Sequence, residues 1–318
     1  MTIDRPVPVT PRRLAATARE RLIAAGIEPG EAAMDAELLT REVLGGWERA
    51  RFLAHRDDPV EGVAGELEAL LTRRERREPI SQVLGRREFW GLEFEVTSAV
   101  LTPRPETELI VEEALAFLRR LVAGDGGAPR GGSGRHGSGG GRPCPPVLHV
   151  ADVGTGSGCL AICLAREIPS ALVFATDVSE PALAVARRNA QRHGVAGRIR
   201  FEAASLLGTA PRPFPLIVSN PPYVPTADLP TLPPEVRAFE PGTALDGGAD
   251  GLAIIRALLD ASRSALSNEG RLIFEFGVGQ ADGVRTAVLE SGLELLAIRP
   301  DLQGIPRTAV AARRGPGA

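Results

Sequence analysis

A glycine-rich turn after a predicted strand constrains this chain more than any other feature. The apolar residues 147–153 run directly into Gly154, Thr155, Gly156, Ser157 and Gly158, and a helical pattern covers residues 158–167. Glycines at such a junction let the backbone turn sharply and approach a ligand closely. The spacing is G-x-G-x-G, one residue tighter than the dinucleotide-binding fingerprint. A tight structural turn is the alternative interpretation.

Strand and helix patterns alternate throughout the part of the chain that follows. Predicted strands cover residues 147–153, 172–176, 199–203, 215–219 and 271–276, with two more near 294–298 and 308–312. Predicted helices cover residues 158–167, 180–193, 252–266 and 280–291. Such alternation predicts an α/β fold, a mostly parallel sheet with helices on both faces.

The first 78 residues have a helical pattern instead. Thr10 and Pro11 form an N-cap followed by a proline at the first helical position, and apolar residues then recur at helical spacing. A short helix is expected near residues 47–54 and a longer one near residues 60–76. We therefore predict that residues 1–78 form a small helical domain. The basic run at residues 73–77 is expected to be a solvated helix end, and a contact with an acidic or nucleic-acid partner is the alternative.

Two other segments interrupt these patterns. Residues 79–102 are predicted to be a β-hairpin linker, with strands at 81–84 and 88–96, and residues 103–318 to be a second domain that starts with a helix from Pro105 to Val122. Residues 124–142 contain ten glycines in nineteen positions, so we expect a flexible insert that fills no core.

Composition excludes several classes of protein. The net charge of −3 provides no global basic field for nucleic acid, and no apolar run approaches the ~20 residues that span a membrane. The N-terminus lacks the apolar core of a signal peptide, and the three cysteines and four histidines form no ligand pattern. We therefore expect a cytoplasmic, metal-free protein with no membrane contact and no direct nucleic-acid partner.

Asp177 adds weight to a nucleoside-binding site. It ends the second predicted strand, where a carboxylate can accept both ribose hydroxyls. No Walker lysine follows the glycine turn, which argues against a triphosphate. S-adenosylmethionine fits better, because its sulfonium and amino acid need no phosphate cradle. Both the turn and Asn220 would lie at the carboxyl ends of parallel strands, where ligands bind in such sheets.

The turn that contains Asn220, Pro221, Pro222 and Tyr223 follows a short buried strand. Neither proline can donate a hydrogen bond to the sheet, so the strand must end there. The Asn220 side-chain oxygen and the Pro221 carbonyl are two acceptors on stiff backbone, and Tyr223 supplies an aromatic face. Such a group suits a planar –NH2. A plain proline-rich turn is the alternative interpretation.

The two motifs together resemble those of amino-methyltransferases that alkylate planar –NH2 nitrogens. The flanking sequence resembles the HemK/PrmC family, the release factor glutamine methyltransferases, over nearly the whole chain. The similar segments are residues 77–79, 88–92, 103–108, 239–241, 244–248 and 301–304.

This resemblance implies an N-terminal helical substrate-recognition domain, followed along the chain by a Rossmann-like class I S-adenosylmethionine-dependent methyltransferase domain. It implies methylation of the glutamine in the Gly-Gly-Gln loop of class I peptide chain release factors. Residues 154–158 and Asp177 would bind the cofactor, while Asn220 and Pro221 would hold the target amide with Tyr223 against it. Residues 203–206 depart from the family's pattern at the adenine contact, which leaves Ser205 or Leu206 as the contact.

Two other functions compete with this one. An adenine-N6 or guanine-N2 methyltransferase acting on nucleic acid would use the same turn, but would need a basic groove or an added target-recognition domain. A non-catalytic scaffold that binds S-adenosylmethionine would not need the intact turn at residues 220–223.

Overall fold

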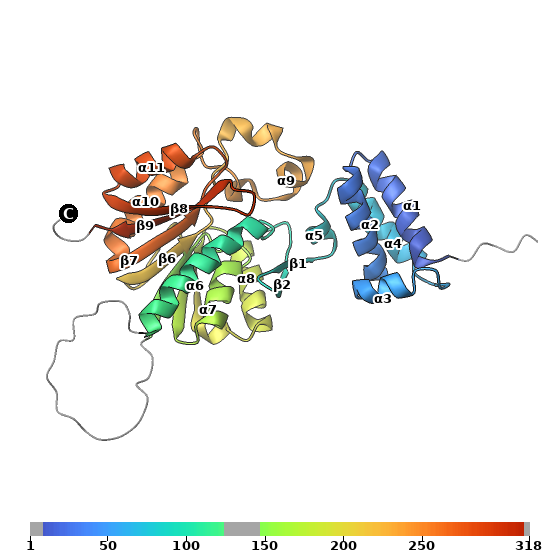
Figure 1. Ribbon diagram of the computed structural model, residues 1–318, viewed down its shortest axis with the longest axis horizontal. Helices are drawn as coiled ribbons and strands as arrows, with labels where there is room; N and C mark the ends of the chain where they lie inside the picture. The colour runs from blue at the N-terminus through green and yellow to red at the C-terminus, as the bar shows by residue number, and fades with distance from the viewer. Residues whose placement is uncertain (1–8, 124–146, 315–318) are drawn as a thin grey trace, which may run out of the picture. The chain divides into compact units, whose positions relative to one another are not determined.

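The structure is a computed structural model that describes residues 9–123 and 147–314 (Figure 1). The glycine-rich insert predicted at residues 124–142 lies outside the described residues. The chain separates into two compact units: residues up to Arg86 together with Leu232–Phe239, and Arg87–Thr231 together with the residues from Glu240 onward. No helix within the two described ranges has the length and apolar character needed to cross a membrane.

The first unit is helical, as the sequence predicts. Its helices are α1 (Pro11–Ala24), α2 (Pro29–Val43), α3 (Arg49–Ala54), α4 (Ala64–Glu75), α5 (Ile80–Val83) and α9 (Pro234–Phe239). Thr10 caps α1 by accepting the Arg13 backbone N–H at 3.4 Å, and the predicted proline follows it as the first residue of the helix. Apolar side chains from α1, α2 and α4 form the core of this unit, among them Leu22, Leu39 and Leu71.

Arg74 lies fully buried in this unit, which corrects the expectation of a solvated helix end. Its guanidinium donates to Asp35 at 2.7 Å, to Glu31 at 2.7 Å and to Glu235 of α9 at 3.0 Å. Arg77 also pairs with Glu235, at 2.7 Å. A buried arginine needs such partners, because an unpaired charge in the interior is very costly. The ion pairs fasten α9 to the helical unit.

The hairpin lies inside the predicted linker, but its first strand is not where we expected it. Residues 81–84 fall largely in α5, which starts after Pro79, and the strands are β1 (Arg86–Phe89) and β2 (Leu92–Glu95). Trp90 and Gly91 join them with φ angles of 54° and 65°. Two consecutive positive φ values are the mark of a two-residue type I′ turn, which pairs the strands immediately before and after it.

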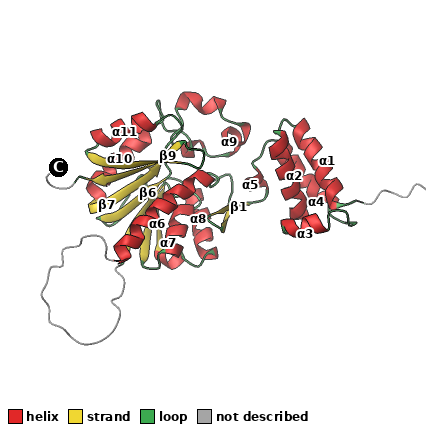
Figure 2. Ribbon diagram, viewed as in Figure 1, coloured by secondary structure: helices red, strands yellow, loops and turns green. Residues whose placement is uncertain are grey.

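The second unit has a seven-stranded sheet in the order β5-β4-β3-β6-β7-β9-β8 (Figure 2). The strands are β3 (Leu148–Val153), β4 (Ala171–Asp177), β5 (Ile199–Ala203), β6 (Phe214–Ser219), β7 (Leu266–Glu275), β8 (Leu293–Pro300) and β9 (Pro306–Arg313). The first five run parallel, and β9 pairs antiparallel with both β7 and β8. This is the α/β sheet that the alternating pattern predicts.

Helices cover both faces of this sheet. On one face lie α6 (Glu108–Ala123), α7 (Cys159–Glu167) and α8 (Glu180–Arg192), and on the other lie α10 (Ala253–Ala265) and α11 (Ala281–Glu290) (Figure 1). Two apolar cores result, one on each face of the sheet, between the strands and the helices that cover them. A short 3-10 turn, Pro105–Thr107, leads into α6.

The strand order reverses beside β3, and the register there sets the site. Val153 of β3 is opposite Ser219 of β6, and Ser219 is opposite Phe274 of β7. The residues that follow these three, Gly154, Asn220 and Glu275, therefore leave the sheet at the same edge. A ligand site is expected at such a reversal, because the loops diverge there to opposite faces.

Candidate active site

A cavity of about 240 Å³ opens at the carboxyl ends of β3, β4 and β6, within the second unit. Its walls bring together the glycine turn, the end of β4, the loop after β5 and the prolines after β6. The predicted site residues among them are Gly154, Thr155, Gly156, Ser157, Asp177, Ser205, Asn220, Pro221 and Pro222. Segments far apart in the sequence thus form one site.

The three glycines of the turn adopt a backbone conformation that other residues rarely adopt. Gly154, Gly156 and Gly158 have φ angles of 72°, 54° and 85°, a region that side chains rarely tolerate. A Cβ on Gly154 or Gly156 would meet no protein atom within 4 Å, whereas one on Gly158 would lie 3.0 Å from Ile162 Cδ1 and 3.1 Å from Ala186 Cβ. The first two glycines therefore leave room for a ligand, and the third lets α7 pack closely.

Asp177 lies at the end of β4 and lines the cavity. Its Oδ2 accepts the Gly156 N–H and its Oδ1 accepts the Ser179 N–H, each at 2.9 Å. These bonds fix the carboxylate beside the glycine turn. Each oxygen keeps lone-pair capacity for a further donor, as two ribose hydroxyls would supply.

Asp152 is a buried member of the turn that the sequence did not single out. Its Oδ2 accepts the Thr155 hydroxyl at 2.6 Å and the Ala161 N–H at 3.1 Å, while its Oδ1 has no hydrogen-bond partner in the described residues. Burial raises the pKa of Asp152 to about 7, and the bonds from Thr155 and Ala161 oppose that increase. This carboxyl holds the glycine turn against the start of α7.

Both candidates for the adenine contact line the cavity. Ser205 is exposed, and Leu206 is half-buried with a φ of 51°. The Thr176 hydroxyl donates to the Leu206 carbonyl, which fixes this loop next to the end of β4. An adenine contact by Ser205 or Leu206 therefore stays a prediction, and both residues lie where such a contact is expected.

Asn220 immediately follows β6 and lines the cavity. Its Nδ2 donates to the Thr107 hydroxyl at 2.9 Å. Its Oδ1 is shielded from water and has no partner in the described residues. A buried acceptor without a partner costs about 1–3 kcal/mol, so a donor that enters the cavity would gain by pairing with it.

Tyr223 is held firmly but does not belong to the walls of this cavity. Its hydroxyl donates to Glu275 at 3.0 Å, and its carbonyl accepts from Gln280 Nε2 at 2.8 Å. Gly247 and Gly251 let the chain pass close by, because a Cβ on either would collide with the Tyr223 backbone. The predicted contact between the Tyr223 ring and the target amide stays a prediction.

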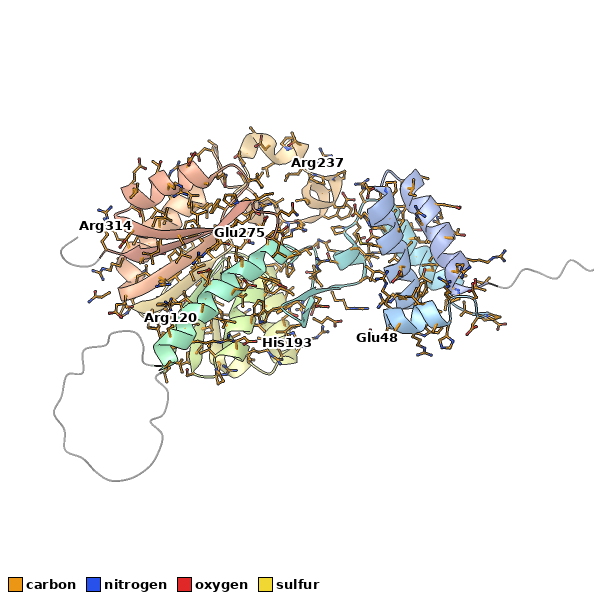
Figure 3. All side chains as sticks on the ribbon, viewed as in Figure 1. Glu48, Arg120, His193, Arg237, Glu275 and Arg314 are labelled. Carbon is orange, nitrogen blue, oxygen red and sulfur yellow. The ribbon has the colours of Figure 1, made fainter. Side chains whose placement is uncertain are left out.

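Two residues that support Asn220 were missed by the sequence analysis. Thr107, in the turn before α6, donates to Glu275 Oε2 at 2.6 Å. Glu275, labelled in Figure 3, ends β7 and is 1% exposed. A single carboxylate inside the apolar run at residues 272–276 was the available signal, since charged residues are seldom fully buried without partners.

The wall residues fit S-adenosylmethionine. The glycine turn leaves open space beside its backbone, Asp177 offers a fixed carboxylate for ribose hydroxyls, and Asn220, whose side-chain oxygen is unpartnered in the described residues, lines the same cavity. In the described ranges no cluster of three or more His, Cys, Asp or Glu side chains is arranged to hold a metal ion.

Comparison with known proteins identifies the family of this chain. Residues 14–85 match the PrmC N-terminal domain, and residues 145–230 match the Methyltransferase small domain. A release factor glutamine methyltransferase of Bradyrhizobium diazoefficiens is 41% identical over 309 residues, which cover 94% of this chain and 93% of that protein. One of Geobacter sulfurreducens is 38% identical over 307 residues, which cover 96% of this chain and 97% of the relative.

A solved structure supports the fold independently. The catalytic domain of hMettl16, crystallised in complex with MAT2A 3′UTR hairpin 6, superposes with a TM-score of 0.52 and 14% identity, over 78% of this chain and 83% of that one. At this identity the likeness concerns the fold alone. Together with the identity to the curated relatives over nearly their full length, the findings show that this chain is a methyltransferase of the release factor glutamine methyltransferase family.

Proposed function

We propose that this protein transfers a methyl group from S-adenosylmethionine to the side-chain amide nitrogen, N5, of the glutamine in the Gly-Gly-Gln loop of class I peptide chain release factors. The observation that carries the proposal is the unpartnered Asn220 Oδ1 beside the cofactor cavity, in a chain whose relatives are named for this reaction. The substrate belongs to translation, so the enzyme would work in the cytoplasm.

Asn220 and Pro221 would act on the amide nitrogen of the substrate. An amide nitrogen is a poor nucleophile because its lone pair is delocalised into the carbonyl. Accepting its two N–H bonds at Asn220 Oδ1 and the Pro221 carbonyl draws electron density toward nitrogen and aims the lone pair. Holding the nitrogen in line supplies proximity, an effect that reaches ~7–11 kcal/mol in ideal cases.

The bound cofactor supplies an electrophilic methyl group on a positively charged sulfur. Residues 154–158 and Asp177 would hold it so that the methyl group faces Asn220. The Tyr223 ring would offer its face to the developing positive charge, a contact of about 1 kcal/mol. The glutamine proton would leave to water after transfer, since an N-alkylated amide cation is strongly acidic.

The helical unit gives the enzyme a second place to contact its substrate. A single glutamine side chain offers few atoms to bind, so the cavity alone could supply little affinity. A second contact on the same release factor would raise the effective concentration of the glutamine at Asn220. A short Gly-Gly-Gln peptide should therefore have a much lower kcat/KM than the intact factor. Similar values for the two substrates would contradict the two-contact proposal.

The direct test is mass spectrometry of a purified class I release factor after incubation with this protein and S-adenosylmethionine. We expect one added methyl group on the Gly-Gly-Gln glutamine, none when that glutamine is replaced by alanine, and a strongly reduced yield when Asn220 of the enzyme is replaced by alanine. Parallel reactions with DNA and RNA serve as the comparison. Methyl label on nucleic acid but never on release factor would refute the proposed function.

A further inference from the structure

We propose that Thr107 and Glu275 are positioning residues that determine which end of the Asn220 amide faces the substrate. The inference rests on the proposed function, because it concerns the same target amide. It assigns a role to a buried carboxylate and a buried hydroxyl that have no part in the chemistry described above.

The three side chains form one continuous hydrogen-bonded chain. Asn220 Nδ2 donates to Thr107 Oγ1 at 2.9 Å, and Thr107 Oγ1 donates to Glu275 Oε2 at 2.6 Å. The other carboxylate oxygen, Oε1, accepts the Tyr223 hydroxyl at 3.0 Å. Glu275 thus holds both ends of the turn at residues 220–223, one directly and one through Thr107.

The direction of this chain follows from the chemistry of its members. An ionised carboxylate can only accept hydrogen bonds, so Thr107 must donate its single hydroxyl proton to Glu275. The Thr107 oxygen can then only accept from Asn220. The –NH2 end of Asn220 must therefore face Thr107, and Oδ1 must be the end left over for a ligand.

That direction is the one the reaction needs. The target nitrogen of a glutamine carries two N–H donors, so it can bind only an acceptor. If Asn220 were turned over, it would present its own –NH2 to the –NH2 of the substrate, and both would lose a partner. The unpartnered state of Oδ1 in the structure is what this arrangement produces.

Burial is the largest influence on Glu275 and raises its pKa above the ordinary value. The hydrogen bonds from Thr107 and Tyr223 and the nearby Arg307 lower the pKa, so they stabilise the ionised form that the direction of the hydrogen-bonded chain requires. The negative charge of Glu106 acts in the opposite direction. The two donated bonds are strong ones, because bonds to ionised groups are about twice as strong as neutral ones.

Two substitutions interrupt the hydrogen-bonded chain from Asn220 to Glu275 or reverse its direction. Thr107→Val removes the hydroxyl but keeps the side-chain shape. Glu275→Gln keeps an oxygen that accepts from Tyr223 but places an –NH2 against Thr107. The Thr107 hydroxyl then accepts from this –NH2 and donates to Asn220, so the Asn220 amide turns over and its –NH2 faces the substrate. Thr107→Ser keeps the hydroxyl and is the rescue variant. We expect kcat to fall about ten- to a hundredfold for the first two, as for loss of one buried hydrogen-bond acceptor, and to stay near wild type for the third.

Thr308→Val is the matched control. Thr308 is fully buried and lies opposite Glu275 in the sheet, yet its hydroxyl has no partner in the described residues. The same chemical change at the same depth should leave kcat unchanged. Calorimetry should give the same S-adenosylmethionine affinity for all four variants, and thermal unfolding shows whether each is folded.

The outcomes separate this proposal from the proposed function. Wild-type protein that fails to methylate release factor refutes the function. An active wild type with Thr107→Val and Glu275→Gln within about threefold in kcat refutes only the positioning role. A Thr107→Ser variant as impaired as Thr107→Val would show that packing rather than the hydroxyl matters, and a parallel loss of cofactor affinity would place these residues in the cofactor site instead. Both results overturn the proposal.

Discussion

Replacing Gly154 by alanine should weaken the binding of S-adenosylmethionine. A control glycine with a similar backbone conformation makes it possible to separate this effect from the effect of backbone strain. Gly154 has a φ of 72° and lines the cavity, and an added Cβ would meet no protein atom within 4 Å. Its N–H is fixed by the Thr176 carbonyl at 2.9 Å, so the turn cannot easily move away. The methyl group would occupy space that a ligand needs.

Gly194 provides the control for strain. It has a φ of 69° and likewise no atom within 4 Å of an added Cβ, but it follows α8 and lies outside the walls of the cavity. Both alanine variants should lose about 1–2 kcal/mol of stability, because L-residues with a side chain resist this conformation. Thermal or urea unfolding measures that loss.

Only Gly154→Ala should affect the cofactor. Forcing one extra methyl group into a filled site costs about 1–3 kcal/mol, and tenfold in Kd corresponds to about 1.4 kcal/mol. The expected loss of S-adenosylmethionine affinity is therefore about 5- to 150-fold by isothermal titration calorimetry, while Gly194→Ala stays at the wild-type Kd. Equal Kd values for the two variants would refute the assignment of this turn to the cofactor.

Three further substitutions test the rest of the site and its support. Asn220→Ala should leave cofactor affinity within about twofold by calorimetry while kcat on release factor falls about a hundredfold or more, as when one preorganised polar partner is removed; turnover within a few-fold would exclude the amide clamp. Gly251→Ala should lower both kcat and melting temperature, because its Cβ would collide with the Tyr223 carbonyl; an unchanged kcat would mean that the turn is not needed in this position. Arg74→Met should cost about 3–5 kcal/mol in chemical unfolding, because it leaves the buried Asp35 carboxylate unpaired, whereas Arg49→Met, at an exposed ion pair, should cost about 0–1 kcal/mol; equal losses would contradict the burial argument.

The positions of the strands and helices of the second unit could be predicted from the sequence because they depend on local patterns. The predicted strand at residues 199–203 and the observed β5 coincide, and most other boundaries differ by one or two residues. The exception is β7, which begins at Leu266, within the predicted end of the preceding helix. The glycine turn, Asp177 and Asn220 meet at one sheet edge as expected, since parallel strands place their carboxyl ends together.

The tertiary structure decided which polar groups are buried and what they pair with. The run at residues 73–77 is strongly basic, and helical spacing places Arg74 on the face of α4 that also carries Leu67 and Leu71. The carboxylates that pair with Arg74 come from α2 and α9, so only the fold shows that this charge can be buried. The direction of the Asn220 amide likewise depends on Thr107 and Glu275, which are 113 and 55 positions away in the sequence. Sequence alone determined that an asparagine stands at the end of a strand before two prolines. Only the packed fold brings a carboxylate and a hydroxyl to it, because hydrogen-bond partners in a protein interior are set by which distant segments meet.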